Sequence, residues 1–432
     1  MINCNLNNRD FSLAKNIVET TEAINQIKLM HKPDTMQEIL IVVDNSGEIV
    51  VLTLDVIKDN KIRTKMNKYG VIKTKKYSAK VDFHDNSPWS VDCKYPYIII
   101  GSNNRTVFVY NYEEENIINN NENNNNILIK NAVIYKGNNN NIPCVTISED
   151  GNFIGNNSID KNFKIFDFHT GELIFSGNNP RNEWGWGMKF IPRNLFKTKE
   201  FEFDSEDMRK DNNLINPALK LNKITELNID NPSKYNENDV DKIPYEELDD
   251  YEKYIKVNLI DKYYILSSCN HCAGLFRLDY KKEENSDKKI IVAIPLGKIE
   301  LSRINIRDLY MGEFNLDYGA MYNINGIYQS SRYEFIFYSK NMNLILLGSK
   351  AGDLHVFEMN LYHDKTNNLI GIEDEPNALI SFRSKIAGMK FLENENDKER
   401  KVIDVFVITL SGIFYYYKIF PDNYFWESHF DE

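Results

Sequence analysis

One strand–turn–strand unit recurs along this chain, and it restricts the possible folds more than any other feature of the sequence. In each copy, a short run of β-branched or aromatic residues ends in small polar residues, turns, and continues as an alternating strand. Apolar residues that alternate on both sides of a compact turn predict antiparallel β-hairpins. The six clearest copies are residues 39–54, 97–112, 152–168, 263–280, 344–359 and 405–419.

A further strand signal precedes several of these hairpins, so the full unit has three or four strands. The unit recurs roughly every 55–60 residues where no insertion intervenes, somewhat longer than the usual period of a propeller blade. Since one small sheet cannot bury both of its faces, the repetition predicts an all-β fold, a β-propeller whose blades cover one another. A β-sandwich is the competing architecture, although sandwiches seldom repeat one turn signature so often. The preceding signals are residues 87–95, 141–151, 183–192, 332–341 and 385–393.

The number of blades depends on one weaker signal. Lys288 to Ile306 can be interpreted as another hairpin around Leu296-Gly297. Counting it gives seven blades, which we prefer, and omitting it gives six. We expect one propeller domain over residues 1–432, with the N-terminal strand region, roughly Leu13 to Met30, pairing with the last blade and locking the ring.

Two kinds of segment interrupt the repeat. Within residues 113–141, the asparagine-rich stretches Glu113 to Asn126 and Gly137 to Asn141 have little to bury and are expected to be disordered loops. The acidic tract 197–256 lies between a strand signal and the next hairpin, so we expect an insertion within a blade, with a helical turn or two in residues 205–224. It is interpreted as a solvated insertion or, alternatively, as a docking segment for a basic partner.

Composition and charge exclude several classes of protein. Hydrophobic residues make up 42% of the 432, and 25 tyrosines and 24 phenylalanines favour strands over helices. Five cysteines and a polar N-terminus fit the nucleus or cytoplasm, and no apolar run is long enough to span a membrane. Of the net charge of −11, most lies in residues 200–255, which contain sixteen Asp/Glu against seven Lys/Arg. No basic stripe is present, so we do not expect direct binding of nucleic acid.

Residues 146–173 resemble a WD40 repeat. The resemblance implies that Asp160 and Asp167 are structural turn residues and that Phe166, on the third strand, packs between blades. The other units match in hydrophobic pattern only, so the chain resembles a degenerate WD40-like propeller. The matching segments are Ser148-Glu149-Asp150-Gly151, Ser158-x-Asp160, Phe166-Asp167 in place of Trp-Asp, and Thr170-Gly171-Glu172.

A narrower resemblance lies in three stretches, residues 87–112, 141–148 and 183–192. In their order and in their residues, these stretches are similar to fungal WD40-like proteins of the family named for constitutive transcription of ribonucleotide reductase genes. The stretches contain no chemical motif. The resemblance implies a nuclear or cytoplasmic regulator of that transcription without catalytic residues.

Cys269 and Cys272 stand three positions apart with His271 between them. Alignment with the other hairpins puts them in the turn between the second and third strands, which is the reading we prefer. A closed zinc site needs four ligands, usually from two such pairs, and a redox pair needs a helix where a strand is expected here. The remaining cysteines are isolated, namely Cys4, Cys93 and Cys144.

The linker Ser176 to Phe190 carries Arg181, Trp184 and Trp186, the residue types that dominate interface energies. Loops between the blades of a propeller lie on a face that often receives partners. The structural alternative is that one or both tryptophans wedge between blades. Asn104 and Arg105, in a turn expected on the same face, are weaker candidates for partner binding.

The sequence contains no phosphate-binding glycine loop and no metalloprotease or esterase motif. We therefore expect a non-enzymatic protein-interaction scaffold without cofactor or bound metal, a monomer within a larger complex of unidentified protein partners. By fold-level analogy it would regulate transcription or serve in a nuclear regulatory or ubiquitin-ligase assembly. The alternative is a propeller-type metal-dependent hydrolase with acidic and asparagine side chains around a central cation.

Overall fold

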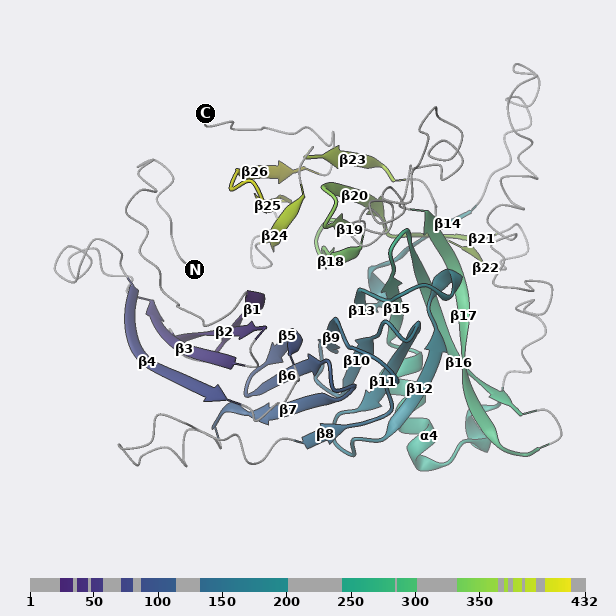
Figure 1. The fold of residues 1–432 in the computed structure, drawn as a ribbon. Helices are drawn as coiled ribbons and strands as arrows, with labels where there is room; N and C mark the ends of the chain where they lie inside the picture. Colours follow the sequence, from purple (N-terminus) through teal and green to yellow (C-terminus); the bar gives the residue numbers. More distant parts are fainter. Residues whose placement is uncertain are drawn as a thin grey trace, which may run out of the picture. The chain divides into compact units, whose positions relative to one another are not determined.

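Figure 1 shows the computed structural model of this chain. The chain divides into two compact units: Met1–Asp160 with Ile165–Leu173, and Lys161–Lys164 with Ile174–Glu432. The structure describes residues 24–33, 37–45, 48–56, 71–80, 87–113, 133–200, 243–283, 286–300, 332–363, 369–371, 376–382, 385–393 and 401–420.

The described residues are mostly β-strands, and five four-stranded sheets form the blades of a β-propeller. The predicted all-β propeller class is therefore confirmed, whereas the preferred number of seven blades is not. One short α-helix, α4 (Asp250–Ile255), occurs among the described residues. No helix in this part of the chain has the length and apolar character that crossing a bilayer requires.

In the first three blades, strands that follow one another in the chain are neighbours in the sheet. Residues of the third blade fall in both compact units. The strands are β1 (Ile24–His31), β2 (Gln37–Asp44), β3 (Glu48–Val56) and β4 (Val71–Lys80); β5 (Pro88–Lys94), β6 (Tyr97–Ser102), β7 (Val107–Asn111) and β8 (Val133–Tyr135); and β9 (Cys144–Ile147), β10 (Phe153–Asn157), β11 (Asn162–Asp167) and β12 (Leu173–Asn178).

The fourth and fifth blades belong to the second unit. The fourth has the order β13-β15-β16-β17, and the fifth has the order β18-β19-β20-β23. Their strands are β13 (Gly187–Pro192), β15 (Tyr263–Ser268), β16 (Cys272–Lys282), β17 (Lys289–Glu300), β18 (Tyr333–Tyr338), β19 (Leu344–Ser349), β20 (Asp353–Glu358) and β23 (Ala378–Ser381).

Two three-stranded sheets and several short helices complete the second unit. The strands β24, β25 and β26 form one antiparallel sheet, and in the other β14 pairs with β21 in parallel. The strands are β24 (Ile386–Glu393), β25 (Ile403–Thr409), β26 (Phe414–Ile419), β14 (Lys197–Glu200), β21 (Asn360–His363) and β22 (Leu369–Gly371), and the helices are η2 (Pro180–Asn182), η3 (Arg193–Leu195), η7 (Tyr245–Glu247) and η8 (Lys256–Ile260).

In each of the six predicted hairpins, the two strands are hydrogen-bonded neighbours in a sheet. The five further strand signals also form strands, namely β5, β9, β13, β18 and β24. Strands β13 and β15 pair with each other, and the acidic tract lies between them in the sequence. Its expected helical segment, residues 205–224, lies outside the described residues.

Two sequence-based predictions about strands are wrong. The segment around Leu296-Gly297 does not turn, because β17 runs through it as one strand paired with β16 along its length. The part of the N-terminal region that the structure describes, Ile24 to Met30, pairs with β2 of the first blade rather than with the last blade. Residues 13–23 lie outside the described part of the chain.

The second asparagine-rich stretch, Gly137 to Asn141, is ordered, contrary to expectation. The hydroxyl of Ser158 donates to the carbonyl of Asn141 at 2.9 Å, and the backbone N–H of Asn139 donates to Asp160 Oδ2 at 2.8 Å. These bonds satisfy the backbone of a polar stretch that has little apolar surface to bury. Most of the first stretch, residues 114–126, lies outside the described residues.

Apolar side chains join successive blades of the first unit. Phe166 is fully buried, and its ring stacks on Tyr135, with centroids 5.7 Å apart and planes at 17°. A large aromatic between blades was expected here, and the structure confirms it. The buried cluster around Phe166 combines residues of the second and third blades, namely Ile99, Val107, Val109, Tyr135, Ile142, Val145 and Ile154.

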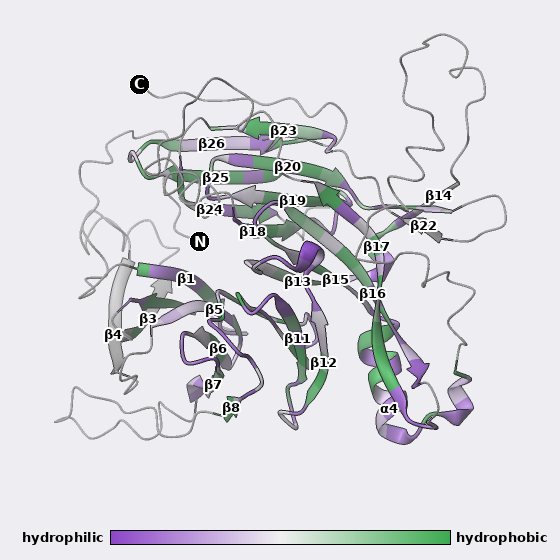
Figure 2. Cartoon of the chain, turned by 45° about the vertical axis from the view of Figure 1, so that its right-hand side comes forward, coloured by the Kyte–Doolittle hydropathy of each residue, from purple (hydrophilic) through white to green (hydrophobic). Residues whose placement is uncertain are grey.

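Two buried clusters join successive sheets of the second unit. Leu347 belongs to a cluster shared by the fourth and fifth blades, and Leu346 belongs to one shared by the fifth blade and the β24–β26 sheet. Because consecutive strand residues point to opposite faces, β19 contributes apolar side chains to both clusters. Strand β20 also contributes to both clusters, through Phe357 and Val356, and Figure 2 shows the hydrophobic residues along β19 and β20.

A serine and a glycine, paired across two neighbouring strands, let the next blade come close. Gly187 pairs with Ser268, whose hydroxyl donates to the carbonyl of Tyr333 in the fifth blade. A Cβ atom on Gly187 would lie only 3.0 Å from that carbonyl oxygen. The second blade repeats the arrangement toward the third with Ser90, Gly101 and the carbonyl of Ile142.

Candidate functional site

The linker between the third and fourth blades, residues 179–186, is held in an unusual backbone conformation. Arg181 and Asn182 have φ angles of 56° and 54°, which non-glycine residues adopt only when surrounding contacts enforce them. Those contacts include the buried Asn179, which accepts a hydrogen bond from the Ser267 hydroxyl at 2.8 Å. We call residues 179–186 the Trp184 loop.

Trp186 lies inside the second unit rather than on its surface. It is 5% exposed, and its indole N–H donates to the side-chain oxygen of Asn270. The guanidinium carbon of Arg332 lies 4.7 Å from the ring centroid, within cation–π distance. Trp186 is therefore a structural anchor, the alternative considered from sequence, and it offers little area to a partner.

Trp184, in contrast, remains at the surface. It is 38% exposed, and its ring meets the ring of Trp186 edge-on, with centroids 6.5 Å apart and planes at 67°. Arg181 is also exposed. The loop thus presents one large aromatic residue and one cation on a buried base.

A second contact fixes the loop to the turn between β15 and β16. The carboxylate of Glu183 accepts a hydrogen bond from the backbone N–H of His271 at 3.2 Å and lies 3.3 Å from its ring Nδ1. The turn is closed by a hydrogen bond from the Cys269 N–H to the Cys272 carbonyl at 2.8 Å. The turn therefore supports the Trp184 loop directly.

Cys269 lies in the turn between the second and third strands, as predicted, and Cys272 is the first residue of the third strand, β16. Both are fully buried, and burial raises the pKa of the Cys269 thiol well above its ordinary value. A buried thiol is a poor nucleophile because the reactive thiolate is disfavoured. Among the residues that the structure describes, no group of three or more His, Cys, Asp or Glu is placed to hold a metal ion.

Asn104 and Arg105 occupy the turn between β6 and β7 in the first unit. Asn104 Oδ1 accepts a hydrogen bond from the backbone N–H of Thr106 at 3.2 Å. The side chain of Asn104 therefore stabilises the turn itself. Arg105 is exposed and has a φ angle of 68°. These residues belong to the first compact unit, whereas the Trp184 loop belongs to the second.

Asp160 and Asp167 act as hydrogen-bond acceptors in the third blade. Asp160 accepts from Asn139, as described above, and the buried Asp167 accepts from the backbone N–H groups of His169 at 2.8 Å and Thr170 at 2.9 Å. A carboxylate that receives two backbone donors fixes the turn that leads into β12.

Replacing Asp167 by alanine is expected to lower the free energy of unfolding by about 1–2 kcal/mol, because two backbone donors lose their acceptor. Urea unfolding of the full chain measures this difference. The exposed Glu172 in the same turn, replaced by alanine, serves as the control and should change the midpoint very little. Equal effects of the two substitutions would contradict the role of Asp167.

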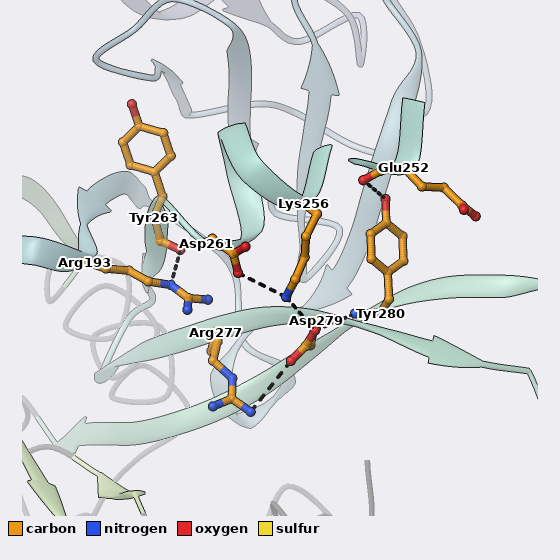
Figure 3. A network of polar contacts seen from close by, with 8 residues as sticks. All are labelled: Arg193, Glu252, Lys256, Asp261, Tyr263, Arg277, Asp279 and Tyr280. Carbon is orange, nitrogen blue, oxygen red and sulfur yellow. Dashed lines mark hydrogen bonds and ion pairs between the residues drawn. The ribbon is translucent and has the colours of Figure 1, made fainter. Parts of the chain in front are cut away.

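A polar network on the fourth blade was not found from the sequence (Figure 3). Lys256 Nζ lies 3.0 Å from Asp261 Oδ1 and 3.2 Å from Asp279 Oδ1, and Arg277 Nη2 lies 3.9 Å from Asp279 Oδ2. Arg193 donates from Nε to the Tyr263 carbonyl at 3.5 Å. These residues come from η3, from η8 and the residue that follows it, from β15 and from β16, so they converge only when the blade and its insertion are folded.

The same network anchors the end of the acidic insertion. The Tyr280 hydroxyl donates to the Glu252 carbonyl at 3.2 Å, and Lys289 Nζ lies 2.6 Å from Glu252 Oε2. Asp249 caps α4 by accepting from the backbone N–H of Glu252 at 2.7 Å. Arg277 and Asp279, two positions apart in an alternating strand, are the one signal in the sequence that could have revealed this cluster.

No family model matches the chain, and no curated protein matches it.

Proposed function

We propose that this chain is a non-enzymatic protein-interaction scaffold whose docking surface is centred on the Trp184 loop. The observation that carries the proposal is the contrast between an exposed Trp184 and the buried, hydrogen-bonded base beneath it. A propeller is consistent with such a role, since rigid blades present loops to partners.

The loop is suited to binding because its conformation is already fixed. Trp184 and Arg181 are of the residue types that most often dominate interface energies. A side chain held in place before binding loses less conformational entropy when a partner arrives. Asn179, Trp186 and Glu183 hold the loop through their contacts with the β15–β16 hairpin and its turn.

Resemblance to the fungal family extends this proposal to a biological role. In that role the chain regulates transcription of ribonucleotide reductase genes in the nucleus or cytoplasm, as a monomer within a larger assembly of proteins. A nuclear regulatory complex or a ubiquitin-ligase assembly would use the same docking surface. Stretches of similar sequence support this extension, and the Trp184 loop overlaps one of them, residues 183–192.

Replacing Trp184 by alanine is expected to weaken partner binding about 30-fold, since a central aromatic contact contributes on the order of 2 kcal/mol. Affinity capture from cell extract followed by mass spectrometry measures the loss. Tyr245→Ala is the matched control, because Tyr245 is an exposed aromatic (48%) on another element, η7. A partner retained equally by both variants, with unchanged unfolding midpoints, would contradict the proposed surface.

A further inference from the structure

A partly buried guanidinium group on the fourth blade lacks a full set of acceptors. Arg193 stacks on Tyr264, with its guanidinium carbon 4.7 Å from the ring centroid, and its Nε makes one long hydrogen bond of 3.5 Å to Tyr263. Its Nη2 is buried and has no hydrogen-bond partner among the described residues. A charged donor left in this state costs more free energy than a neutral one, so a missing acceptor is expected.

Among the described residues that form a polar cluster around this group, the positive charges outnumber the negative ones. Three cations, Arg193, Lys256 and Arg277, share two carboxylates, Asp261 and Asp279 (Figure 3). Lys256 contacts both carboxylates within 3.2 Å, so it takes the larger share of their charge. Counted over these five described residues, the cluster therefore carries one positive charge in excess.

The surroundings of Arg193 show that this excess is costly. Burial, the largest influence, lowers the pKa of Arg193, and the positive charge of Arg277 lowers it further. Tyr264, Asp261 and Asp279 act in the opposite direction without cancelling the effect. Removing charge from water is compensated in proteins by pairing it with an opposite charge.

We propose that Arg193 and Arg277 together bind the carboxylate group of a ligand. A carboxylate has two oxygens that match the guanidinium fork, and its single negative charge equals the excess of the cluster. A phosphate monoester carries close to two negative charges at pH 7 and would leave the site negative beside Asp261 and Asp279. The carboxylate belongs to a small organic acid or to an acidic peptide, and this site does not depend on the Trp184 loop.

Isothermal titration of the full chain at constant ionic strength tests the proposal with three probes: sodium acetate, hexaglutamate and sodium phosphate. Acetate should bind the unaltered protein more tightly than phosphate, and Arg193→Gln should weaken acetate binding at least tenfold. If hexaglutamate binds no more tightly than its number of carboxylates predicts, the site is assigned to small acids. If hexaglutamate binds more tightly than that, the site is assigned to acidic peptides.

Lys199→Gln is the control, because Lys199 is an exposed cation on the adjoining strand β14 and pairs with Glu358. Its acetate affinity should equal that of the unaltered protein. Arg193→Lys keeps the charge and loses the fork, so it should bind acetate less tightly, and it replaces the glutamine variant if that one fails to fold. Undetectable acetate binding, tighter binding of phosphate, or equal acetate affinity of the Arg193 and Lys199 variants would overturn the proposal.

Discussion

Replacing Phe166 by alanine is expected to lower the free energy of unfolding by about 3–5 kcal/mol, the usual cost of removing a buried phenylalanine. Its ring is fully buried and stacks on Tyr135, so the substitution removes contacts from both sides of the boundary between the second and third blades. The surrounding residues are held by strand pairing and cannot collapse into the space. Chemical unfolding followed by far-ultraviolet circular dichroism measures the loss.

Leu173→Ala provides the matched comparison within the same sheet. Leu173 lies on β12 and is 46% exposed, so truncating it removes little buried surface and should change stability by less than about 0.5 kcal/mol. If the two variants unfolded at the same denaturant concentration, Phe166 would not be joining the blades.

Strands and hairpins were predictable because they depend on local pattern. The alternation of apolar residues and the small polar residues at each turn specify a hairpin without any knowledge of the rest of the chain. Residues 263–280 illustrate this, since β15 and β16 form with the Cys269–Cys272 turn between them.

The number of blades was less predictable because proline and glycine have more than one use in a strand. Around Pro295 and Gly297 they were interpreted as a turn, yet the register shows a β-bulge: Leu275 pairs with Gly297 and Phe276 with Pro295. A bulge bends a strand and adds one residue without ending it. Only pairing with β16 over the full length distinguishes the two outcomes.

The candidate site was partly predictable for a similar reason. Trp184 and Trp186 are two positions apart, and composition alone marked both as interface residues. The structure separates them, because Trp186 finds a hydrogen-bond acceptor in Asn270 and a cation in Arg332, which are distant in sequence. The network of Arg193, Lys256 and Asp279 likewise needed the fold, since an insertion stands between its members.

Replacing Gly187 by alanine, which adds one methyl group, is expected to lower the free energy of unfolding by about 3 kcal/mol. This value is in the upper part of the range for overpacking. Its Cβ would overlap Ser268 Oγ and lie 2.7 Å from Ile336 Cδ1 and 3.0 Å from the Tyr333 carbonyl oxygen. Relieving these overlaps moves the fifth blade away from the fourth. The hydroxyl of Ser268 then loses its acceptor, which adds the cost of an unsatisfied buried donor.

Gly388→Ala separates this steric effect from the general effect of removing a glycine. Gly388 also lies in a strand, β24, and a Cβ atom there would meet only Ile408 Cγ2 at 3.4 Å, an ordinary contact. Its replacement should be neutral or stabilise the chain by about 0.4–1 kcal/mol, because alanine has fewer unfolded conformations than glycine. Thermal unfolding of both variants measures the difference. If the Gly187→Ala protein were as stable as the Gly388→Ala protein, the close approach of the two blades would not depend on the absence of a side chain at Gly187.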